Sequence, residues 1–493
     1  MKYISTRGEK EAIASAAAII RGLAPDRGLY VPEKITALPC TPKEIAGMAY
    51  ASVAEKILAA FLTDYSREEL AECAERAYDA KFDTPKIAPV VKTEKAYFLE
   101  LWHGPTSAFK DMALSVLPWL LTAAARKEGE NKKIAILTAT SGDTGKAALA
   151  GFADVPGTEI IVFYPKDGVS FVQERQMLTQ AGGNVHVFGV RGNFDDTQTG
   201  VKDAFSDNAF AEELASKGCR LSSANSINIG RLVPQIAYYV YAYAALLAQG
   251  EIRDGEYVNI CVPTGNFGNI LAAWYAKAMG LPVHRLICAS NENKVLADFI
   301  GTGVYDKRRE FILTSSPSMD ILVSSNLERL LWHLSGGDSE MIRSLMASLS
   351  GAGFYSAGRE IQSALGDFHG GFADMAASHA ALARLWREEK YLMDTHTAVA
   401  YAVYMDYRKQ TGDETKTLIA STASPYKFAG NVAGALGIAC GENEFHAIES
   451  LTKETGTPVP ANLRGLDSKP VIHETVIDKA GVKEAVRGAL NDV

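Results

Sequence analysis

Apolar residues recur along the chain in two patterns, which predict two kinds of structure. Up to about residue 80 they recur at helical spacing, and residues 9–22, 41–62 and 66–80 predict helices. Beyond Pro85, apolar runs of strand length alternate with helical stretches. The runs of strand length cover residues 132–137, 160–164, 185–190, 257–262, 285–289 and 417–420. Buried strands that alternate with helices indicate right-handed βαβ units, and therefore an α/β fold with largely parallel sheets.

Two later segments depart from this alternation. Residues 318–391 have a mainly helical pattern, and we expect them to form an insertion between strands of the α/β core. Within them, Ser325 to Glu328 have the spacing of a capping box that opens a helix. One apolar face of that helix is formed by Leu327, Leu330, Leu331 and Leu334. The segment after Cys440 predicts a helix, a proline-rich crossing and a last helix near residues 479–490.

Composition and charge exclude several classes of protein. The formal net charge of −8 gives no basic surface, which argues against nucleic acid or an anionic membrane as a partner. The most apolar long stretch, residues 232–248, is interrupted by Pro234 and Gln235, so it predicts a core helix rather than a membrane span. The chain's apolar content of 47% and charged content of 22% are those of an ordinary soluble globular protein.

The cysteines indicate the compartment. Six cysteines are scattered without pairing or CxxC spacing, as in reduced thiols, and they predict neither a disulfide framework nor a zinc site. We expect no metal ligands elsewhere. The N-terminus has charges spread through it and lacks the order of a signal peptide. These features favour the cytoplasm.

The most informative segment is WHGPTSAFKDM, residues 102–112, which contains Lys110. A lysine after a Gly-Pro turn, next to an aromatic residue and small hydroxyl residues, suits Schiff-base chemistry. Such an amine needs partial burial to lower its pKa, and the backbone must let a cofactor approach closely. Taken alone, a lysine after a turn is typical of a solvated surface. The loops described next favour the catalytic interpretation of Lys110 over the surface one.

One of these loops follows the predicted strand at residues 257–262 and precedes a helix. Its glycines, Gly265 and Gly268, let successive backbone N–H groups point into one concavity, and the helix N-terminus adds its positive dipole end. The loop lacks the third glycine of a dinucleotide fingerprint and the Lys-Ser/Thr of a Walker A loop. It predicts a phosphate cup, with a plain strand-to-helix turn as the alternative.

Two further loops offer hydroxyl groups at strand ends. Residues 139–145 resemble a P-loop only superficially, because Ala147 stands where Ser or Thr is required after Lys146. This hydroxyl-rich helix start suits the binding of a small carboxylate, and the alternative is an ordinary turn that binds no ligand. The loop after residues 417–420 places Thr422 at a strand end, where a hydroxyl can donate to an unprotonated ring nitrogen.

A third polar segment, residues 222–231, ends in Arg231. Side-chain amides and hydroxyls that lead to one arginine suit a phosphate monoester, because the guanidinium group binds phosphate through two parallel hydrogen bonds. A capped loop with a surface arginine explains the same pattern, and the sequence by itself leaves both interpretations open.

Five segments together resemble the longer form of the threonine synthase family. These are HGPTSAFKD, TATSGDTG, PTGNFGN, the pair SPSMDI and SNLER, and STASPYKF, in that family's order. The opening APDRGLYVPE is similar to the family's start as well, so the resemblance covers nearly the whole chain.

The resemblance implies an enzyme that depends on pyridoxal 5′-phosphate (PLP), of fold type II and tryptophan-synthase-β-like. It implies the conversion of O-phospho-L-homoserine and water to L-threonine and phosphate, with Lys110 as the Schiff-base lysine. The implied cofactor-binding residues are Lys110, Gly265, Asn266, Phe267, Gly268, Asn269, Thr422 and Asp143. The implied substrate-binding residues are Ser141, Gly142, Asp143, Thr144, Asn225, Ser226, Asn228 and Arg231.

Fold type II implies two α/β domains. The expected ranges are a mainly helical region over 1–95, a large PLP-binding domain over 96–112 and 240–440, a small domain over 113–239, and a C-terminal segment over 441–493. Monomers and homodimers both occur in this fold type, and the sequence leaves the oligomeric state open.

Two chemical questions also remain open. Many fold type II enzymes carry Asn where this chain has Asp143, and a carboxylate beside the cofactor's phenolate would repel it unless one of them is protonated. A phospho-lyase that gives 2-oxobutyrate, or a non-catalytic PLP-binding homologue, are the alternatives to a synthase.

Overall fold

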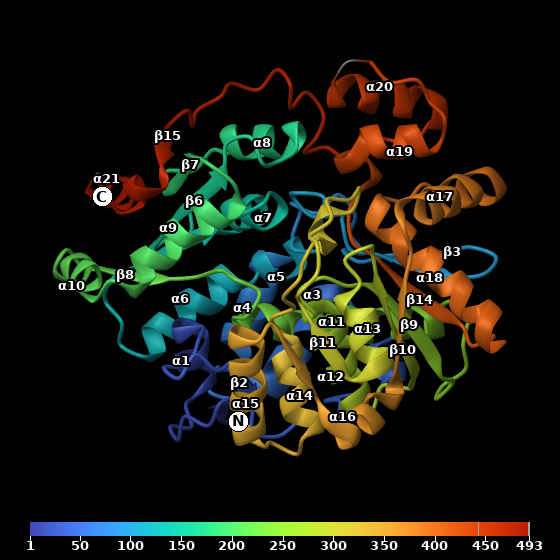
Figure 1. Ribbon diagram of the computed structural model, residues 1–493, viewed down its shortest axis with the longest axis horizontal. Coiled ribbons are helices and arrows are strands. Elements are labelled where there is room, and N and C mark those ends of the chain that lie inside the picture. Colours follow the sequence, from blue (N-terminus) through green and yellow to red (C-terminus); the bar gives the residue numbers. More distant parts are fainter. Residues whose placement is uncertain (442, 492–493) are drawn as a thin grey trace.

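Two separate β-sheets organise the computed structural model, which describes residues 1–441 and 443–491 (Figure 1). The larger sheet has six strands in the order β13-β10-β9-β14-β4-β3. These strands are β3 (Val90–Lys92), β4 (Tyr97–Glu100), β9 (Val258–Pro263), β10 (Val283–Ser290), β13 (Phe368–Phe372) and β14 (Thr417–Ser421). All neighbours pair in parallel except β3, which runs antiparallel to β4.

The smaller sheet has five parallel strands in the order β15-β7-β6-β5-β8. They are β5 (Lys133–Ala139), β6 (Thr158–Pro165), β7 (Val185–Arg191), β8 (Cys219–Ser222) and β15 (Val476–Asp478). Helices α7 (Asp143–Phe152), α8 (Phe171–Leu178), α9 (Phe194–Ser206) and α10 (Asn208–Ser216) connect its strands. The six strands predicted from the sequence are all present, so the expected α/β fold with two largely parallel sheets is confirmed.

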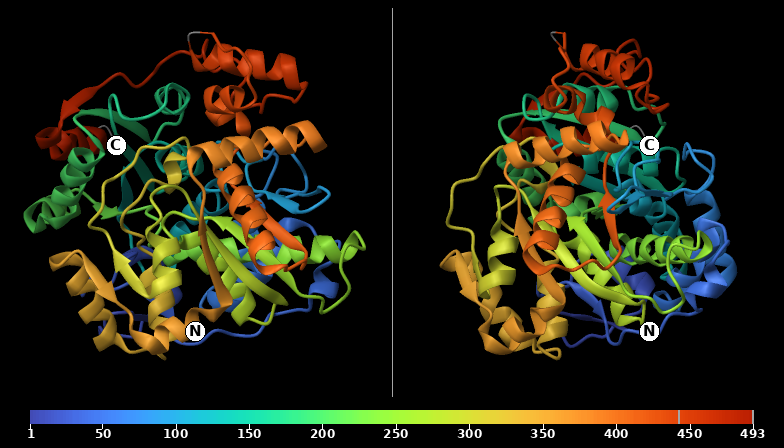
Figure 2. Two further views of the ribbon diagram at one scale, coloured as in Figure 1. Left: turned by 45° about the vertical axis from the view of Figure 1, so that its right-hand side comes forward. Right: turned by 90° about the vertical axis from the view of Figure 1, so that its right-hand side faces the viewer.

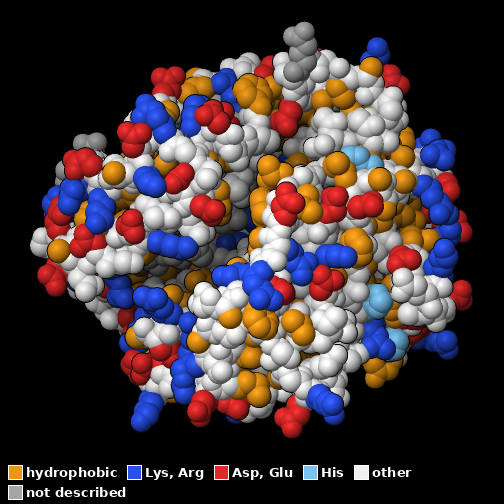
Figure 3. All heavy atoms as spheres, viewed as in Figure 1, with side chains coloured by type: hydrophobic (Ala, Val, Ile, Leu, Met, Phe, Trp, Pro, Cys, Tyr) orange, Lys and Arg blue, Asp and Glu red, His pale blue; other side chains and the backbone are white. Residues whose placement is uncertain are grey.

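The register of the larger sheet brings three loops to one edge. Strand β14 lies between β9 and β4, and Ser421 pairs with Glu100 while Ile419 pairs with Cys261. The carboxyl ends of β4, β14 and β9 therefore meet. Ligands of open α/β sheets bind outside the carboxyl ends of the strands, so this edge is where a site is expected. Figure 3 shows a face that is hollowed between the smaller lobe and the larger body.

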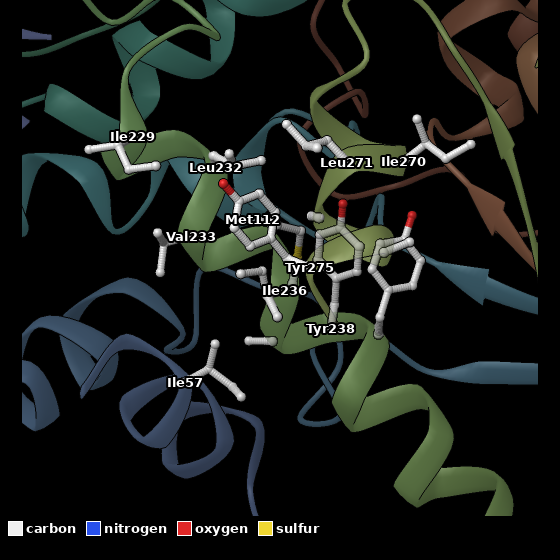
Figure 4. Close-up of a cluster of buried hydrophobic side chains, with 14 of the residues drawn as sticks. Ile57, Met112, Ile229, Leu232, Val233, Ile236, Tyr238, Ile270, Leu271 and Tyr275 are labelled. Atoms are coloured by element: carbon white, nitrogen blue, oxygen red, sulfur yellow. The ribbon is translucent and has the colours of Figure 1, made fainter. Parts of the chain in front are cut away.

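A central helix packs between the elements that surround the larger sheet. Helix α11 (Ile229–Ala248) is buried along most of its length and packs against α3 (Tyr50–Phe61) and α12 (Gly268–Ala278). Figure 4 shows Met112, two residues after Lys110, inside this core. The apolar stretch at 232–248 is thus a core helix, as predicted. Among the described residues, no helix combines the length and apolarity that crossing a membrane requires.

The N-terminal helices are shorter than predicted. The structure has α1 (Ser15–Arg21), α2 (Pro42–Ile45), α3 and α4 (Arg67–Ala77). The expected single helix over 41–62 is wrong, because the chain turns at Gly47, whose φ is +85°. Strand β2 (Tyr30–Pro32) lies within residues 28–32, whose sequence predicts a short extended run between the helices, and it pairs antiparallel with β1 (Tyr3–Ser5), which was not predicted.

The segment over 318–391 contains helices α14 (Leu327–Leu334), α15 (Ser339–Gly351), α16 (Gly358–Ala364) and α17 (Met375–Glu389). It also contains β12 (Phe354–Ser356), which pairs with β11 (Val304–Asp306), and the edge strand β13. The predicted capping box is wrong. The N-cap residue is Asn326, its side chain makes no cap bond, and Glu328 instead accepts hydrogen bonds from Thr6 and Arg7.

The C-terminal segment joins both lobes. After α19 (Ala429–Ala435) and α20 (Glu444–Thr455), the chain crosses over α8, as Figure 2 shows. Arg175 of α8 donates to the carbonyl groups of Leu466, Asp467 and Lys469 at 3.2, 2.8 and 2.5 Å. The chain then adds β15 to the smaller sheet and ends in α21 (Val482–Asn491). Strand β15 was not predicted from the sequence.

Candidate active site

The turn that carries Lys110 is fixed by the carboxylate of Asp111. Thr106 donates to it through its N–H at 2.9 Å and its hydroxyl at 2.6 Å. A Cβ on Gly104 would lie 2.5 Å from the Asp111 Cβ, so the glycine is needed for this close approach. Lys110 therefore leaves a rigid turn at the carboxyl end of β4.

The Lys110 amine is buried among polar groups. Its Nζ lies 3.3 Å from Ser318 Oγ and 3.7 Å from Asp143 Oδ2, and its side chain is 11% exposed. Burial lowers the pKa of this amine, and the positive charges of Lys427 and Arg231 lower it further, while Asp143 acts in the opposite direction. A lysine with a lowered pKa is available as a neutral nucleophile, which is the property required for a Schiff base.

Asp143 has two cationic partners. Its Oδ1 lies 2.5 Å from Lys427 Nζ and accepts a hydrogen bond from the Gln173 side chain at 2.9 Å. Burial by itself would raise the pKa of Asp143, but Lys427 and Lys110 hold this pKa below its usual range. The structure thus explains how a buried carboxylate stays ionised beside Lys110.

The loop after β9 has the geometry of an anion cup. Phe267 has a left-handed φ of +62° and is the N-cap residue of α12. Among the described residues, no acceptor bonds the backbone N–H groups of Gly265, Asn266 and Phe267. Gly268 and Asn269 start the helix, where N–H groups lack intrahelical partners. These free donors favour a phosphate cup over a plain turn.

The cup is held in place by its neighbours. Ser324 donates to the Gly265 carbonyl at 2.7 Å, and the Asn326 side chain donates to the Asn266 carbonyl at 3.0 Å. The Asn269 side-chain oxygen accepts hydrogen bonds from Tyr238 and Tyr239, whereas its Nδ2 is buried with no partner among the described residues. An unpartnered buried donor next to the cup fits an anionic group such as the PLP phosphate.

Thr422 lies beside the Lys110 turn. The N–H of Phe109 donates to the Thr422 carbonyl at 2.8 Å, and Ala108 forms an antiparallel bridge with Ala423. Thr422 is 5% exposed. The structure therefore brings together the Lys110 turn, the Thr422 loop and, through Ser318, the cup.

Arg231 is buried rather than on the surface. Its Nη1 donates to the Ala224 carbonyl at 2.8 Å, while its Nε has no partner among the described residues. Burial lowers the pKa of its guanidinium group to about 10. A buried cation with a free donor fits a phosphate group, which favours the substrate-site interpretation.

The neighbours of Arg231 serve other purposes. The Asn228 side chain caps α11, accepting from Gly230 N–H at 2.9 Å and donating to the Ile19 carbonyl at 2.9 Å. Asn225 is exposed, and the Ser226 carbonyl accepts a hydrogen bond from Asn326. Only Arg231 of this group combines burial with a free donor in the described structure.

The start of α7 holds the remaining predicted residues. The N-cap residue Gly142 has a φ of +135°, and the Thr140 hydroxyl accepts from the N–H groups of Gly142 and Gly145. Ser141 is exposed and Thr144 is half-buried. Their hydroxyl groups make no hydrogen bond to the described residues, so both stay available to a ligand at this helix start.

Three residues at the site were not predicted as site residues: Lys427, Gln173 and Ser318. Lys427 could have been found, because it follows a strand end and a proline turn, as Lys110 does. Ser318 stands in the segment SPSMDI, but the resemblance assigned it no role, and Gln173 carried no signal of its own. Both reach the site through contacts between separate segments: Gln173 of α8 bonds Asp143 of α7, and Ser318 lies 208 positions after Lys110.

Comparisons with known proteins agree with this geometry. Family models described as "Threonine synthase N terminus", "Pyridoxal-phosphate dependent enzyme" and "Threonine synthase, C-terminal" match residues 2–78, 82–422 and 397–486. A threonine synthase of Pseudomonas aeruginosa is 38% identical, with 87% of this chain and 89% of that protein covered. "Threonine synthase-like 1" of Macaca fascicularis is 38% identical over 95% of this chain, which spans 62% of that relative's length.

A solved structure supports the same relationship. The PLP-bound threonine synthase from Brucella melitensis superposes with a TM-score of 0.88 at 34% identity, covering 99% of both chains. The fold type II architecture and the PLP cofactor expected from the sequence are therefore confirmed. The chain belongs to the threonine synthase family of pyridoxal-phosphate-dependent enzymes.

Proposed function

We propose that this chain converts O-phospho-L-homoserine and water to L-threonine and phosphate. The observation that carries the proposal is a buried lysine amine and a buried arginine in one site. Lys110 has a lowered pKa, and Arg231, whose charge contributes to that lowering, keeps an unpartnered Nε. The first suits a covalent cofactor link, and the second suits a phosphate that is both handle and leaving group.

The cofactor would be held by residues of the three loops. Gly265, Asn266, Phe267, Gly268 and Asn269 would hold its phosphate, and Thr422 would face its ring nitrogen. When bound, PLP supplies an electron sink for charge that develops on the substrate. Ser141, Gly142 and Thr144 would bind the substrate carboxylate at the N-terminus of α7.

Proton transfer falls to Lys110. Once its amine is free and neutral, Nζ can accept the proton from the substrate's α carbon, because burial favours the uncharged form. Ser318 Oγ accepts a hydrogen bond from this nitrogen and fixes its direction. Arg231 would stabilise the departing phosphate, which gains charge as its bond breaks.

Asp143 and Lys427 would set the charge around this amine. The carboxylate of Asp143 lies between the two lysines, at 2.5 Å from Lys427 Nζ and 3.7 Å from Lys110 Nζ. With Lys427 as its main partner, Asp143 balances the buried positive charge without taking a proton. The repulsion expected between a carboxylate and the cofactor's phenolate is thereby reduced.

The cysteines indicate the compartment in which the protein acts. All six cysteines are free in the described structure, as expected for a reducing environment, so we propose the cytoplasm.

The intact Lys110 turn and cup argue against a non-catalytic homologue. A phospho-lyase shares these groups, and product analysis separates it from a synthase.

The decisive experiment is product analysis by proton and phosphorus NMR, with PLP-loaded protein and O-phospho-L-homoserine. We expect threonine to appear in step with phosphate. Release of 2-oxobutyrate with phosphate would assign the phospho-lyase reaction instead. Absence of phosphate release from loaded protein would refute the proposed substrate.

A further inference from the structure

Ser318 contacts four parts of the molecule at once, and one of these contacts is the hydrogen bond that its hydroxyl donates to Asp143 Oδ2 at 3.5 Å. Its Oγ accepts from Lys110 Nζ at 3.3 Å, and its carbonyl oxygen would lie 2.5 Å from a Cβ on Gly265. Its N–H donates to Nε2 of His396 at 3.1 Å. His396 thus supports, from behind, the residue that contacts the reactive amine and the cup.

His396 is itself oriented by a buried carboxylate. It lies in the first turn of α18 (Thr395–Thr411), is 3% exposed, and its Nδ1 is 2.8 Å from Oδ1 of Asp394. Asp394 is fully buried, and it also accepts hydrogen bonds from the His396 N–H and the Thr397 hydroxyl. The neighbouring Thr395 hydroxyl donates to the Ser315 carbonyl at 2.6 Å. The first turn of α18 therefore holds the segment that carries Ser318 at two points.

These contacts fix the tautomer of His396. A backbone N–H can only donate, so Nε2, which faces Ser318, must be the nitrogen without a proton. The proton then lies on Nδ1 and is donated to Asp394. The other tautomer would point an N–H group at the N–H of Ser318, which would break this contact.

We propose that His396, oriented by Asp394, is a positioning residue that holds Ser318 against Lys110. This inference rests on the proposed function, because it assigns His396 a role in that reaction. The Ser318 hydroxyl fixes the direction of the Lys110 amine only while its backbone is held. A displacement of about 1 Å in a catalytic group can lower the rate about 100-fold.

Two substitutions of His396 separate positioning from packing. His396→Phe removes the acceptor and keeps a ring, whereas His396→Gln keeps an acceptor near the position of Nε2. Asp394→Asn is nearly isosteric, and its amide can donate to Nδ1, which transfers the ring proton to Nε2. His369→Phe is the matched control, since His369 packs against Tyr407 in the larger lobe and makes no hydrogen bond to Ser318 in the described structure.

The measurements are kcat and KM for O-phospho-L-homoserine, thermal stability, and the visible spectrum of the bound cofactor as a function of pH. We expect His396→Phe and Asp394→Asn to lower kcat about 100-fold and to change KM less than about threefold. Their spectral midpoints should shift by roughly 0.5–1 pH unit, because the Lys110 nitrogen loses a fixed partner. His396→Gln and His369→Phe should stay within about tenfold of the unsubstituted protein in kcat and keep its spectral midpoint.

Four outcomes decide between positioning, packing and failure of the proposed function. Unchanged kcat and spectrum in His396→Phe would overturn the inference, as would equal losses in all four variants that follow thermal stability. If His396→Phe does not fold, an unchanged kcat in Asp394→Asn overturns it. If the unsubstituted protein does not turn over O-phospho-L-homoserine, the proposed function fails, and a spectral shift confined to His396→Phe and Asp394→Asn still supports the positioning of Lys110.

Discussion

The Asp143 carboxylate and the Lys427 ammonium group lie 2.5 Å apart in the interior, with side chains that are 4% and 0% exposed. Asp143 belongs to the smaller lobe and Lys427 to the larger one, where its Nζ also donates to the Thr106 carbonyl at 3.0 Å. This ion pair therefore links the two lobes directly beside Lys110.

Removal of one member of the pair is expected to be costly. Lys427→Met leaves Asp143 buried with less compensation, and we expect the free energy of unfolding to fall by about 3–5 kcal/mol. The double variant Asp143→Asn/Lys427→Met removes both charges and should recover most of that loss. Urea unfolding measures the free energy of unfolding of the single and the double variant. A double variant that loses the sum of the single losses would contradict the pairing.

Lys146 provides a control for this experiment. It is buried on the same helix as Asp143, and its Nζ donates to Gln180. Burial lowers its pKa to about 7, so it carries only part of a charge at neutral pH. Lys146→Met should lower the free energy of unfolding by about 1 kcal/mol, far less than Lys427→Met.

Lys110→Ala should abolish the covalent link to PLP. We expect loss of the cofactor's visible absorbance and, after borohydride reduction, no cofactor-labelled peptide. Lys146→Ala should keep both signals, although Lys146 is the other lysine with a clearly lowered pKa. A label that persists in Lys110→Ala would show that another amine carries the cofactor.

Arg231→Ala should raise KM and lower kcat together, because a phosphate handle that is also the leaving group is bound in both the ground and the transition state. Loss of a charged hydrogen-bond donor is expected to lower kcat/KM by at least about 10-fold. The control is Arg220, whose side chain is 40% exposed and pairs with Glu130. Arg220→Ala should leave kcat and KM unchanged. A change in stability without a change in kcat or KM would make Arg231 a structural residue.

His103 predicts a pH dependence of stability. It lies between Asp83 and Glu100, with ring nitrogens 2.5 and 2.9 Å from their carboxylates. Burial would lower its pKa, but the two carboxylates raise it to about 9 from 6.5. Because the folded-state pKa is raised, the stabilisation is complete below about pH 6.5 and is lost as the pH rises through about 9.

The corresponding variant is His103→Gln. Below pH 6.5 we expect it to lower the free energy of unfolding by up to about 3 kcal/mol, and above pH 9 by much less. Chemical unfolding at several pH values measures this difference. A loss that is the same at all pH values would refute the charged state of His103.

Gly142→Ala should disturb Asp143 through Gln173. A Cβ at this position would lie 2.5 Å from the Gln173 side chain, which donates to Asp143. We expect a loss of about 2 kcal/mol of stability, together with lower kcat. Gly157→Ala is the matched control, because Gly157 also has a positive φ, of +77°, but has open space around it. Equal effects of both substitutions on kcat would show that backbone strain alone is responsible.

Local sequence patterns predicted the strands well because the parallel strands are buried on both faces. Residues 160–164 and 257–262 are continuous apolar runs, and they became β6 and β9. Strand β13, with the sequence FHGGF, has no such run. It forms because its backbone extends the edge of β10, and Gly370 admits the close approach of Ala297.

Those residues of the site that lie within short characteristic segments could be predicted from the sequence. Lys110, the cup and Arg231 each stand in a short segment with a recognisable pattern. Ser325 to Glu328 have an equally clear pattern, yet Glu328 pairs with Arg7 from the other end of the chain. Partners such as Ser318 and Gln173 depend on contacts between segments that are apart in the sequence, by 208 positions for Ser318 and Lys110 and by 30 for Gln173 and Asp143, and no local pattern encodes such contacts.

The position of β14 in the larger sheet has a consequence for biosynthesis. Lys427, which follows this strand, comes 321 positions after Thr106, whose carbonyl it binds. At roughly 5–20 residues per second, a ribosome needs about 15–65 s to make the intervening chain. During that interval β4 lacks its neighbour β14, and the Lys110 turn lacks its contacts with Thr422 and Ala423. We therefore expect cofactor capture to be a late event, which follows synthesis of the chain at least as far as Lys427.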